Sequence, residues 1–466
     1  MDSTIQAERL KQTAQRLFEA HKYQEAVNLC KRALIINAGD SDILEMLARL
    51  YLILGQNRES ADLFERLSRS QAAKPEIWYG LGTAWSRLEN FAEAASAFRK
   101  AVELHPTHVE SFNGLGRALH ASADFEAARE ALETALKISP ECSESWYNLG
   151  LIESDQGALD KARADFERAA KANPEFAPIW NNLGTVQLRA GNLKEARLAY
   201  EKALQVKPDY ATPKHGLEEL SRKHFQKGVE FLKGGKNAEA LSEFDSAIEI
   251  NQLDTAAYSN RALSSLRLGK LRRALSDYSE AIRLEPLKFR GYLNRGHVHF
   301  LARDYKRAIE DFSQAYRLEP RSVAALMERG LAWMKLRKFN EALADLNLAI
   351  ELQADDPVLY FSRGLIYSKL SNWEACLEDL NKAIEMNPEL ALAYLHRGLA
   401  YKYMKKFDLA LADLNKSLEL GPDDNAAYYV RAWTEFSLKD YKTAIGDLGK
   451  FLGKRSFSVL RQFKFR

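Results

Sequence analysis

Residues 77–106 read IWYGLGTAWSRLENFAEAASAFRKAVELHP, and this stretch decides the fold. Small and apolar residues recur in it at spacings of three and four, in two sets: Trp78, Leu81, Gly82 and Trp85, then Ala94, Phe98 and Ala101. Such spacing places each set on one face of a helix. The small Gly82 and Ala94 would let two helices approach closely, and Pro106 would end the second one. The stretch therefore predicts a helical hairpin.

The same pattern returns at a spacing of about 34 residues along almost all of the 466-residue chain. A proline recurs at the thirty-second position of most repeats: Pro106, Pro140, Pro174, Pro208, Pro286, Pro320, Pro388 and Pro422. One hairpin cannot bury both of its faces, so neighbouring hairpins must stack. We therefore expect an all-α protein, a right-handed α-solenoid (superhelix) of about thirteen 34-residue helix-turn-helix repeats.

The repeats fall into two arrays, and a ten-residue insert, ATPKHGLEEL, separates them at 211–220. Residues 1–220 are expected to hold the first array and a capping or linking helix at 211–220, residues 221–458 the second array, and residues 459–466 a short basic tail. The insert predicts one long helix that ends near the glycines at 234 and 235, with a change of path near 211–235. The expected repeats are 7–40, 41–74, 75–108, 109–142, 143–176 and 177–210, then 221–254, 255–288, 289–322, 323–356, 357–390, 391–424 and 425–458.

The pattern W-x2-L-G-x2-W/Y, followed by Ala, an aromatic residue and Pro, resembles the tetratricopeptide repeat family over nearly the whole chain. The first two repeats depart from it, with Leu10 and Leu44 at the aromatic position and Ala38 and Ala72 at the proline position. Irregular terminal repeats of this kind suit a cap. The resemblance implies a protein-interaction solenoid in which the first helix of each hairpin lines a concave groove.

A cation and an acid are paired by position in every repeat of the second array. The seventh position holds Lys227, Arg261, Arg295, Arg329, Arg363, Arg397 and Arg431, and the twenty-third holds Glu243, Asp277, Asp311, Asp345, Asp379, Asp413 and Asp447. The first array has mostly Leu and Ala at these positions. Both positions border the helix-packing stripes, so we predict an ion pair in each repeat, either within a hairpin or across to the next.

Composition and charge exclude several classes of protein. The chain is 46% hydrophobic and 28% charged, which is too apolar for disorder. Its start lacks signal-peptide features and no long uncharged apolar run appears, so we expect a soluble, cytoplasmic protein without membrane insertion. Residues 1–220 carry 27 basic and 32 acidic residues, a net charge of −5, and the remainder carries a net charge of +8. Because the predicted ion pairs absorb seven of those cations, no nucleic-acid partner is expected.

Motifs for catalysis or for a cofactor do not appear in the sequence. There is no phosphate-binding GxxxxGK[ST], no HExxH and no Cys/His metal spacing, and the three cysteines are widely scattered. His297 and His299 are two residues apart and diverge on a helix. We therefore expect no cofactor, no metal and no enzymatic activity.

The candidate binding site is an apolar strip on the first helices of the second array. The inward positions that the resemblance implies are there unusually apolar: Leu293, His297, Phe300, Met327, Leu331, Met334, Phe361, Leu365, Leu395, Leu399, Tyr429, Trp433 and Phe436. Large exposed apolar patches mark interaction sites, and flexible Met with aromatic anchors suits a peptide or helix. The alternative is that these first helices simply bury a wider face.

A second, polar candidate consists of asparagines at inward positions: Asn113, Asn148, Asn182, Asn260 and Asn294. They resemble side chains that hold peptide backbones in related superhelices, although asparagine on a helix surface is commonly just solvated. The two-carboxylate clamp of chaperone-binding repeats maps onto Phe225, Val229, Asn260, Arg290 and Asn294, where two of five residues match. Capture of heat-shock chaperone tails is therefore not expected.

The sequence predicts a non-enzymatic scaffold or adaptor that binds peptide segments or helices of other proteins in the groove of a superhelix. Two alternatives remain open. One is a substrate-presenting or regulatory arm of an enzyme whose catalytic subunit is separate, and the other is a nucleic-acid-binding repeat protein, which predicts steep salt-dependent binding.

Overall fold

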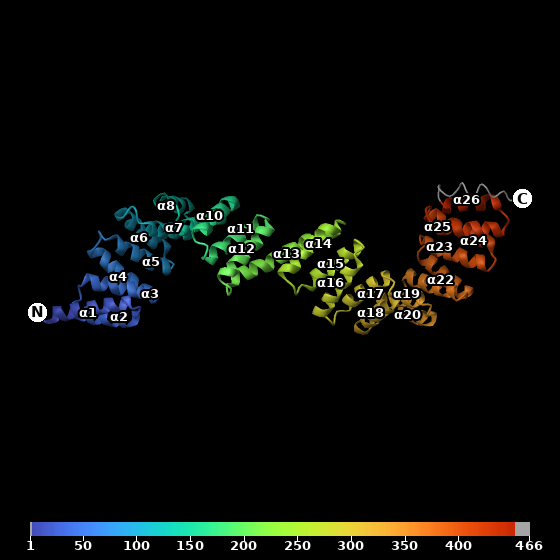
Figure 1. Ribbon diagram of the computed structural model, residues 1–466, viewed down its shortest axis with the longest axis horizontal. Coiled ribbons are helices and arrows are strands. Elements are labelled where there is room, and N and C mark those ends of the chain that lie inside the picture. Colours follow the sequence, from blue (N-terminus) through green and yellow to red (C-terminus); the bar gives the residue numbers. More distant parts are fainter. Residues whose placement is uncertain (1, 453–466) are drawn as a thin grey trace. The chain divides into compact units, whose positions relative to one another are not determined.

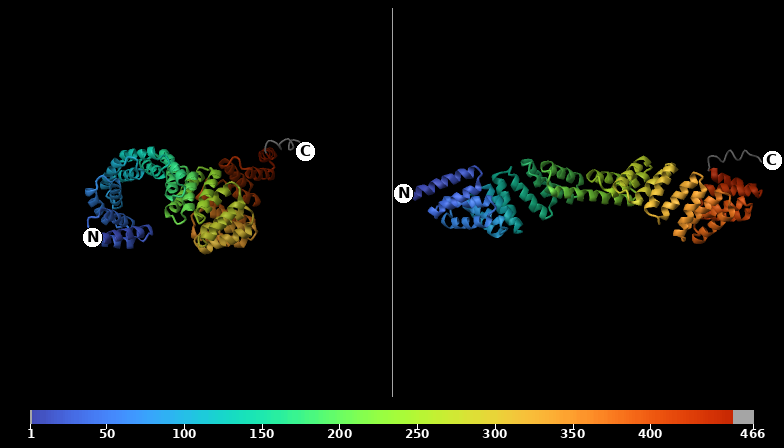
Figure 2. Two further views of the ribbon diagram at one scale, coloured as in Figure 1. Left: turned by 60° about the vertical axis from the view of Figure 1, so that its left-hand side comes forward. Right: turned by 90° about the horizontal axis from the view of Figure 1, so that it is seen from below.

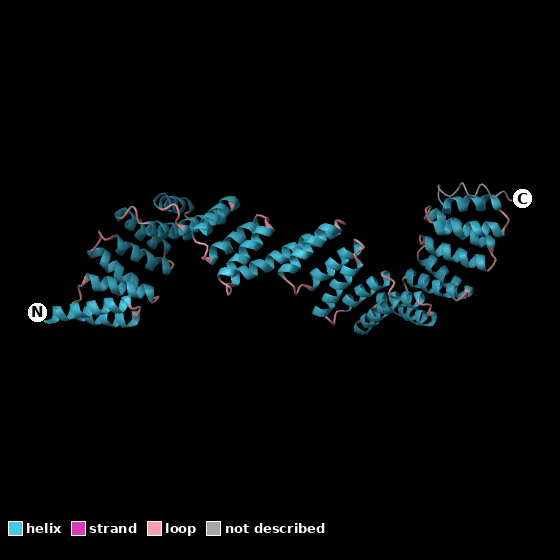
Figure 3. Cartoon of the chain, in the orientation of Figure 1, coloured by secondary structure: helices cyan, strands magenta, loops and turns pink. Residues whose placement is uncertain are grey.

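The computed structural model describes residues 2–452, and their side chains from residue 5 onward. Within that range the chain forms helices and loops and no strand (Figure 3). The expected basic tail, 459–466, and the end of the last expected repeat, 453–458, lie outside the described residues.

The helices of the first half are α1 (Asp2–Glu19), α2 (Tyr23–Ile36), α3 (Ser41–Ile53), α4 (Asn57–Ser70), α5 (Pro75–Arg87), α6 (Phe91–Leu104), α7 (Val109–Ala121), α8 (Phe125–Ile138), α9 (Ser143–Asp155), α10 (Leu159–Ala172), α11 (Ala177–Arg189), α12 (Leu193–Val206) and α13 (Ala211–Lys233). Those of the second half are α14 (Asn237–Ile250), α15 (Thr255–Arg267), α16 (Leu271–Leu284), α17 (Phe289–Leu301), α18 (Tyr305–Leu318), α19 (Val323–Lys335), α20 (Phe339–Leu352), α21 (Pro357–Lys369), α22 (Trp373–Met386), α23 (Ala391–Tyr403), α24 (Phe407–Leu420), α25 (Asn425–Ser437) and α26 (Tyr441–Leu452).

Two compact units divide the chain, Met1–Leu220 and Ser221–Arg466, which we call the first and second arrays. Within each array the helices form hairpins that stack in chain order, as the colours of Figure 1 show. The hairpins of the first array follow a curved path in the left view of Figure 2. The chain is therefore an all-helical solenoid in each array.

The turn inside each hairpin places one residue in the left-handed backbone region. Such residues reverse the chain after the last turn of a helix. They recur at a constant spacing of one repeat, except that Gly191 and Gly235 lie further apart because of the insert between them. The full set is His21, Gly55, Glu89, Ala123, Gly157, Gly191, Gly235, Gly269, Arg303, Arg337, Ser371, Lys405 and Lys439. The period of the sequence is thus also the period of the backbone geometry.

The two helices of a hairpin meet where the first helix has no side chain. A Cβ atom added at Gly82 of α5 would lie 2.8 Å from the ring of Phe98 in α6. On the other side of the same ring, a Cβ atom at Gly114 of α7 would lie 2.6 Å away. Phe98 is 1% exposed, so its ring fills the space between two successive first helices. This contact sets both the hairpin and its stacking on the next hairpin.

The predicted ion pairs of the second array are confirmed, and they lie within each hairpin. Arg329 of α19 donates from Nε and Nη2 to the two carboxylate oxygens of Asp345 in α20, at 2.8 and 2.7 Å. Arg261, Arg295, Arg363, Arg397 and Arg431 form the same two-bond fork with the acid of their own hairpin. Lys227 departs from the pattern, because its single ammonium reaches Glu243 only at 3.8 Å. A planar guanidinium matches a carboxylate in two bonds, and an ammonium cannot.

The third donor group of each arginine reaches the preceding hairpin. The Nη1 atom of Arg363 donates to Oδ1 of Asn347 at 2.8 Å, and that of Arg397 to Oδ1 of Asn381 at 2.7 Å. Arg329 uses the hydroxyl of Ser313 in the same way, at 3.1 Å. Each guanidinium therefore ties three helices together, namely the two of its own hairpin and the second helix of the hairpin before it.

Asp165 of the first array stands at the twenty-third position, but the seventh positions of its own and the next repeat hold Leu149 and Leu183, so the sequence predicts no cation partner for it. In the structure Arg168, one helical turn further along α10, lies 3.3 Å from its carboxylate. Burial nevertheless raises the pKa of Asp165 to about 6, because Arg168 is 58% exposed and offsets little of the desolvation.

Replacing Arg329 with Leu should destabilise the second array by roughly 3–5 kcal/mol, because the buried carboxylate of Asp345 would lose its partner. The double variant Arg329→Leu with Asp345→Ala copies Leu81 and Ala97 of the first array and should recover most of that loss. Hydrogen exchange of α19 and α20 in the full chain, together with chemical denaturation, measures both effects. Asp165→Leu is the matched control and should cost less, since Arg168 stays solvated. Equal small losses for Arg329→Leu and Asp165→Leu would contradict a structural role for the forks.

Stability of the last hairpin should depend on pH through Glu435 of α25. Burial raises the pKa of this carboxyl to about 7, nearby Asp447 adds to the rise and Arg431 opposes it. Its Oε2 atom has no hydrogen-bond partner among the described residues. A raised pKa means that folding favours the protonated form, so the stabilisation is complete below the unfolded pKa of about 4.3 and is lost as pH rises through about 7.

We expect amides of α25 and α26 to open more easily at pH 8 than at pH 6, by about 1 kcal/mol. Hydrogen exchange corrected for intrinsic rates measures this difference, and Glu435→Gln should remove it. A difference that persists in Glu435→Gln would assign the pH dependence to another group.

Candidate partner-binding surfaces

The apolar strip predicted for the second array lies on successive first helices. Here it denotes the thirteen residues Leu293, His297, Phe300, Met327, Leu331, Met334, Phe361, Leu365, Leu395, Leu399, Tyr429, Trp433 and Phe436, which belong to α17, α19, α21, α23 and α25. Tyr429 and Trp433 are exposed, at 43% and 44%. Leu395 is 5% exposed and packs with Leu414 and Leu418 in the core. The remaining ten are half-buried.

The half-buried members lie at the margin of the core rather than within it. Met327 and Met334 contact a fully buried cluster around Leu326, Leu346 and Leu359. Phe361 borders the cluster that contains Cys376 and Leu380 in the same manner. The fully buried residues fill the space between the helices, and the half-buried residues of the strip cover the edge of this core. Part of each strip side chain except that of Leu395 is therefore available to a partner.

A histidine–glutamate pair is the polar feature of the strip. Nδ1 of His297 in α17 lies 3.3 Å from Oε1 of Glu328 in α19, across two neighbouring first helices. This hydrogen bond raises the pKa of His297. In contrast, burial lowers the pKa of His396, whose ring stands edge-on to Phe361 at 5.7 Å. His297 is therefore a polar side chain, with an acid as its partner, in an otherwise apolar surface.

Aromatic residues gather where the strip reaches α25. The ring of Trp433 lies 6.2 Å from that of Tyr429 and 5.4 Å from that of Phe436. Tyr429 also contacts Phe451 of α26, at 5.1 Å. Large exposed aromatic side chains supply contact area at low conformational cost, so this group can act as an anchor point.

The candidate asparagines divide into buried and accessible ones. Asn113 and Asn148 are buried, at 2% and 4% exposure, whereas Asn182 and Asn260 are half-buried and Asn294 is exposed. The Oδ1 atom of Asn113 accepts a hydrogen bond from the hydroxyl of Ser145 at 2.7 Å, which links α7 to α9. Asn113 thus has a structural partner. The Nδ2 atom of Asn148 has none among the described residues.

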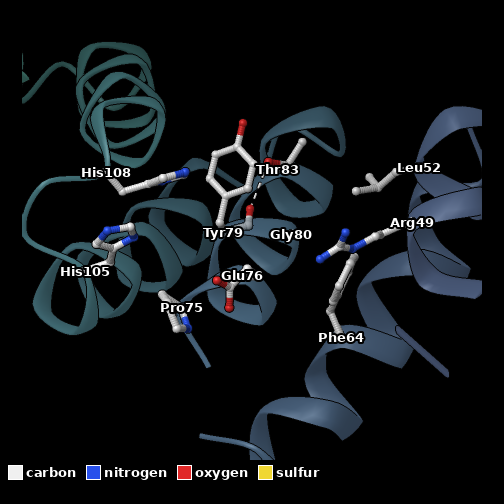
Figure 4. A pocket seen from close by; sticks show the side chains of 10 residues that line it. All are labelled: Arg49, Leu52, Phe64, Pro75, Glu76, Tyr79, Gly80, Thr83, His105 and His108. Atoms are coloured by element: carbon white, nitrogen blue, oxygen red, sulfur yellow. Dashed lines mark hydrogen bonds between the residues drawn. The ribbon is translucent and has the colours of Figure 1, made fainter. Parts of the chain in front are cut away.

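Two pockets of the first array were not predicted from the sequence. The first has a volume of about 290 Å³ and lies between α3 and α5, with Arg49 and Leu52 on one side and Tyr79, His105 and His108 on the other (Figure 4). The second, of about 510 Å³, is lined by Arg117, His120, Ser143, Glu144, Tyr147, Asn148, Leu151, Asn173 and Phe176. One feature of the sequence could have indicated these pockets. The fifth position of the repeats alternates between tyrosine and asparagine, at Tyr79, Asn113, Tyr147 and Asn181.

The first two positions of the chaperone clamp, Phe225 and Val229, are occupied by packing residues in this chain. Phe225 and Val229 pack at the edge of the core around Phe244, and the rings of Phe225 and Phe244 lie 5.8 Å apart. A clamp requires Lys and Asn at these two positions. The first helix of that repeat instead uses them for packing.

Neither a membrane span nor a metal cluster is present in the described part of the chain. No helix between residues 2 and 452 is long and apolar enough to cross a membrane. In the same range no three His, Cys, Asp or Glu side chains are grouped so that they could hold a metal ion.

Many solved structures are similar to this chain, and the following three are examples. The APC/C hetero-tetramer Cut9-Hcn1 has a TM-score of 0.43 and 15% identity over 99% of this chain and 96% of that chain. YrrB, a TPR protein with an unusual peptide-binding site, has a TM-score of 0.33 and 28% identity over 40% of this chain and 95% of its own. MamA has a TM-score of 0.33 and 22% identity over 35% of this chain and 95% of its own. No curated protein matches the sequence.

Comparison with protein families gives matches along both arrays. Models of the Tetratricopeptide repeat match residues 45–109, 113–175, 153–211, 225–287, 260–318, 293–357, 357–390 and 391–424. These segments cover well over half of the sequence and correspond to the helical hairpins of the structure. The chain therefore belongs to the tetratricopeptide repeat family.

Proposed function

We propose that this protein is a non-enzymatic scaffold that binds peptide segments or helices of other proteins on the apolar strip of the second array. The observation that carries the proposal is the strip itself, to which five successive first helices contribute half-buried or exposed apolar side chains. An extended apolar surface of this kind on a folded protein is typical of an interaction site. Leu395 is left out of the proposed surface because it is buried.

The composition of the strip favours a protein segment as its occupant. Met327 and Met334 have flexible, polarisable side chains that adapt to different apolar partners. Tyr429 and Trp433 provide exposed aromatic rings that a partner can cover. A segment with apolar residues on one side, either a helix or an extended peptide, would bury these side chains.

The arginine forks argue against a nucleic-acid partner. A protein that binds nucleic acid needs cations free to neutralise phosphates. Six arginines of the second array instead direct two donors at a buried acid of their own hairpin. Their charge is already compensated inside the array, so the net charge of +8 overstates the positive surface on offer.

Changing Met327, Leu331 and Phe361 together to Ser tests the proposal. We expect the triple variant to fold, since all three side chains are only half-buried, and to lose the proteins that the unchanged chain recovers from its native cell. Circular dichroism and hydrogen exchange check the fold, and quantitative affinity purification measures the loss.

The matched control removes three exposed leucines outside the strip. Leu253, Leu287 and Leu352 are 73%, 82% and 39% exposed, and their replacement by Ser should leave both fold and partners unchanged. A triple variant of the strip that unfolds would assign these residues to the core. One that folds normally and keeps every partner would refute the binding surface.

A further inference from the structure

Two of the pockets in the first array, the one beside Tyr79 and the one beside Tyr147, are equivalent sites two repeats apart. Adding 68 to a lining residue of the first pocket gives a lining residue of the second in every case except Phe64. Arg49, Glu76 and Tyr79 become Arg117, Glu144 and Tyr147. Thr83 becomes Leu151 and His108 becomes Phe176 in the same way. The surface of the first array therefore has a period of two hairpins, twice the period of its core.

Alternation at two positions of the repeat produces this longer period. The fifth position changes from Tyr79 to Asn113 and back to Tyr147, and the ninth position holds Arg49 and Arg117 with Thr83 between them. Neither position belongs to the stripe that closes the hairpin, which holds leucine followed by glycine or alanine from the second repeat of the first array onward. Tyr79 and Tyr147 are half-buried and line the pockets, whereas Asn113 between them is buried.

Each pocket combines apolar walls with a charge-balanced rim. In the second pocket Nη1 of Arg117 lies 3.5 Å from Oε1 of Glu144, so the cation has its own acid. In the first pocket Nη2 of Arg49 lies 2.5 Å from Oε1 of Glu45, so this cation also has its own acid, and Figure 4 shows Arg49 across the pocket from His105 and His108. With one acid for each arginine, neither pocket selects an anionic side chain. Leu52 and Phe64 in the first pocket, and Leu151 and Phe176 in the second, provide apolar contact instead.

A buried amide in the second pocket lacks a hydrogen-bond acceptor. Asn148 is 4% exposed, and its Nδ2 atom is enclosed and unpaired among the described residues. A buried donor without a partner is unfavourable, because it has lost its hydrogen bonds to water and gained none in the protein. Rotation of the terminal amide about χ2 is easy, so a carbonyl oxygen that enters the pocket can satisfy this group. Asn148 corresponds to Gly80 of the first pocket, so only the second pocket contains this amide.

The two pockets lie along successive first helices, since α5 contacts α7 and α7 contacts α9. Burial raises the pKa of Tyr79 in the first pocket, and the next largest cause is the carboxylate of Glu144 in the second. Packed helices lie 8–10 Å apart, so sites two hairpins apart are separated by roughly 20 Å. An extended chain advances about 3.3 Å per residue and spans that distance in roughly six residues, whereas a helix would need roughly thirteen.

We propose that the first array binds an extended segment of another protein, which inserts two apolar side chains roughly six residues apart into the two pockets. The backbone of the segment passes along α5, α7 and α9, and one of its carbonyl oxygens accepts a hydrogen bond from Asn148. This site is separate from the apolar strip of the second array, and it rests on the proposed function of the chain as an interaction scaffold.

Selection from a displayed library of random peptides of about twelve residues, on the full chain, tests the proposal. We expect enriched peptides to share two apolar positions roughly six residues apart. Thr83→Arg fills the first pocket and Leu151→Arg the second, and each should weaken binding of an enriched peptide roughly tenfold or more. When the selection is repeated on either variant, the enriched peptides should keep only one of the two apolar positions, because one pocket is filled. Phe176→Arg, at an exposed position of the second pocket, replaces Leu151→Arg if the latter disturbs the fold.

Control variants separate this site from the strip. Glu130→Arg adds the same side chain at an exposed position of α8 outside both pockets and should leave binding unchanged. The triple Ser variant at Met327, Leu331 and Phe361 should also bind the enriched peptides normally, even if it loses cellular partners. The proposal is overturned if no peptide is enriched, or if the enriched peptides have apolar residues at the spacings of three and four that are typical of a helix. It is also overturned if the enriched peptides lose binding only to the triple Ser variant and bind Thr83→Arg and Leu151→Arg normally.

Discussion

The structure depends on one packing contact, in which a large side chain of the second helix occupies the place left by a missing side chain on the first. The Phe98 ring is enclosed between Gly82 of its own hairpin and Gly114 of the next. No Cβ atom could be accommodated at either glycine without moving the ring or a helix. The same residue thus closes one hairpin and positions its neighbour. Repetition of this contact makes a solenoid, because each hairpin buries its faces only against the hairpins beside it.

Besides this contact, the two arrays differ in how successive hairpins are held against each other. In the first array glycine also occurs at the sixth position, as at Gly80 and Gly114, so successive hairpins meet through close approach of the backbone. The second array has no glycine there in the repeats from 255 onward and uses the arginine forks instead. Arg363 holds Asp379 with two donors and Asn347 of the preceding hairpin with the third. A fork has a fixed geometry, so it specifies the register between hairpins more sharply than apolar contact does.

These constraints leave the inward residues of the first helices free to vary. Where the forks specify stacking, the strip can be apolar without being needed for the core, and Met327 and Phe361 remain half-buried. Where glycines specify stacking, tyrosine, asparagine and arginine can alternate to give pockets with a period of two hairpins. A solenoid offers this freedom because its core is built by residues at the seventh, eighth, twentieth and twenty-fourth positions, and its binding surface is built by others.

The sequence by itself determined the helical hairpin, the length of the repeat and the pairing of Arg with Asp. Spacings of three and four require a helix, and a cation that appears with an acid in every copy requires proximity. Only the tertiary structure decided that each arginine also reaches the preceding hairpin, since that partner, always 16 residues before the arginine, varies among Ser, Asn and Asp and carries no charge in most repeats. It also decided that Leu395 and Asn148 are buried while Leu293 and Asn182, at the same positions of their repeats, are only half-buried. Helical periodicity gives the face of a residue but not how far a neighbouring hairpin covers it, and that coverage depends on the size of side chains one repeat away.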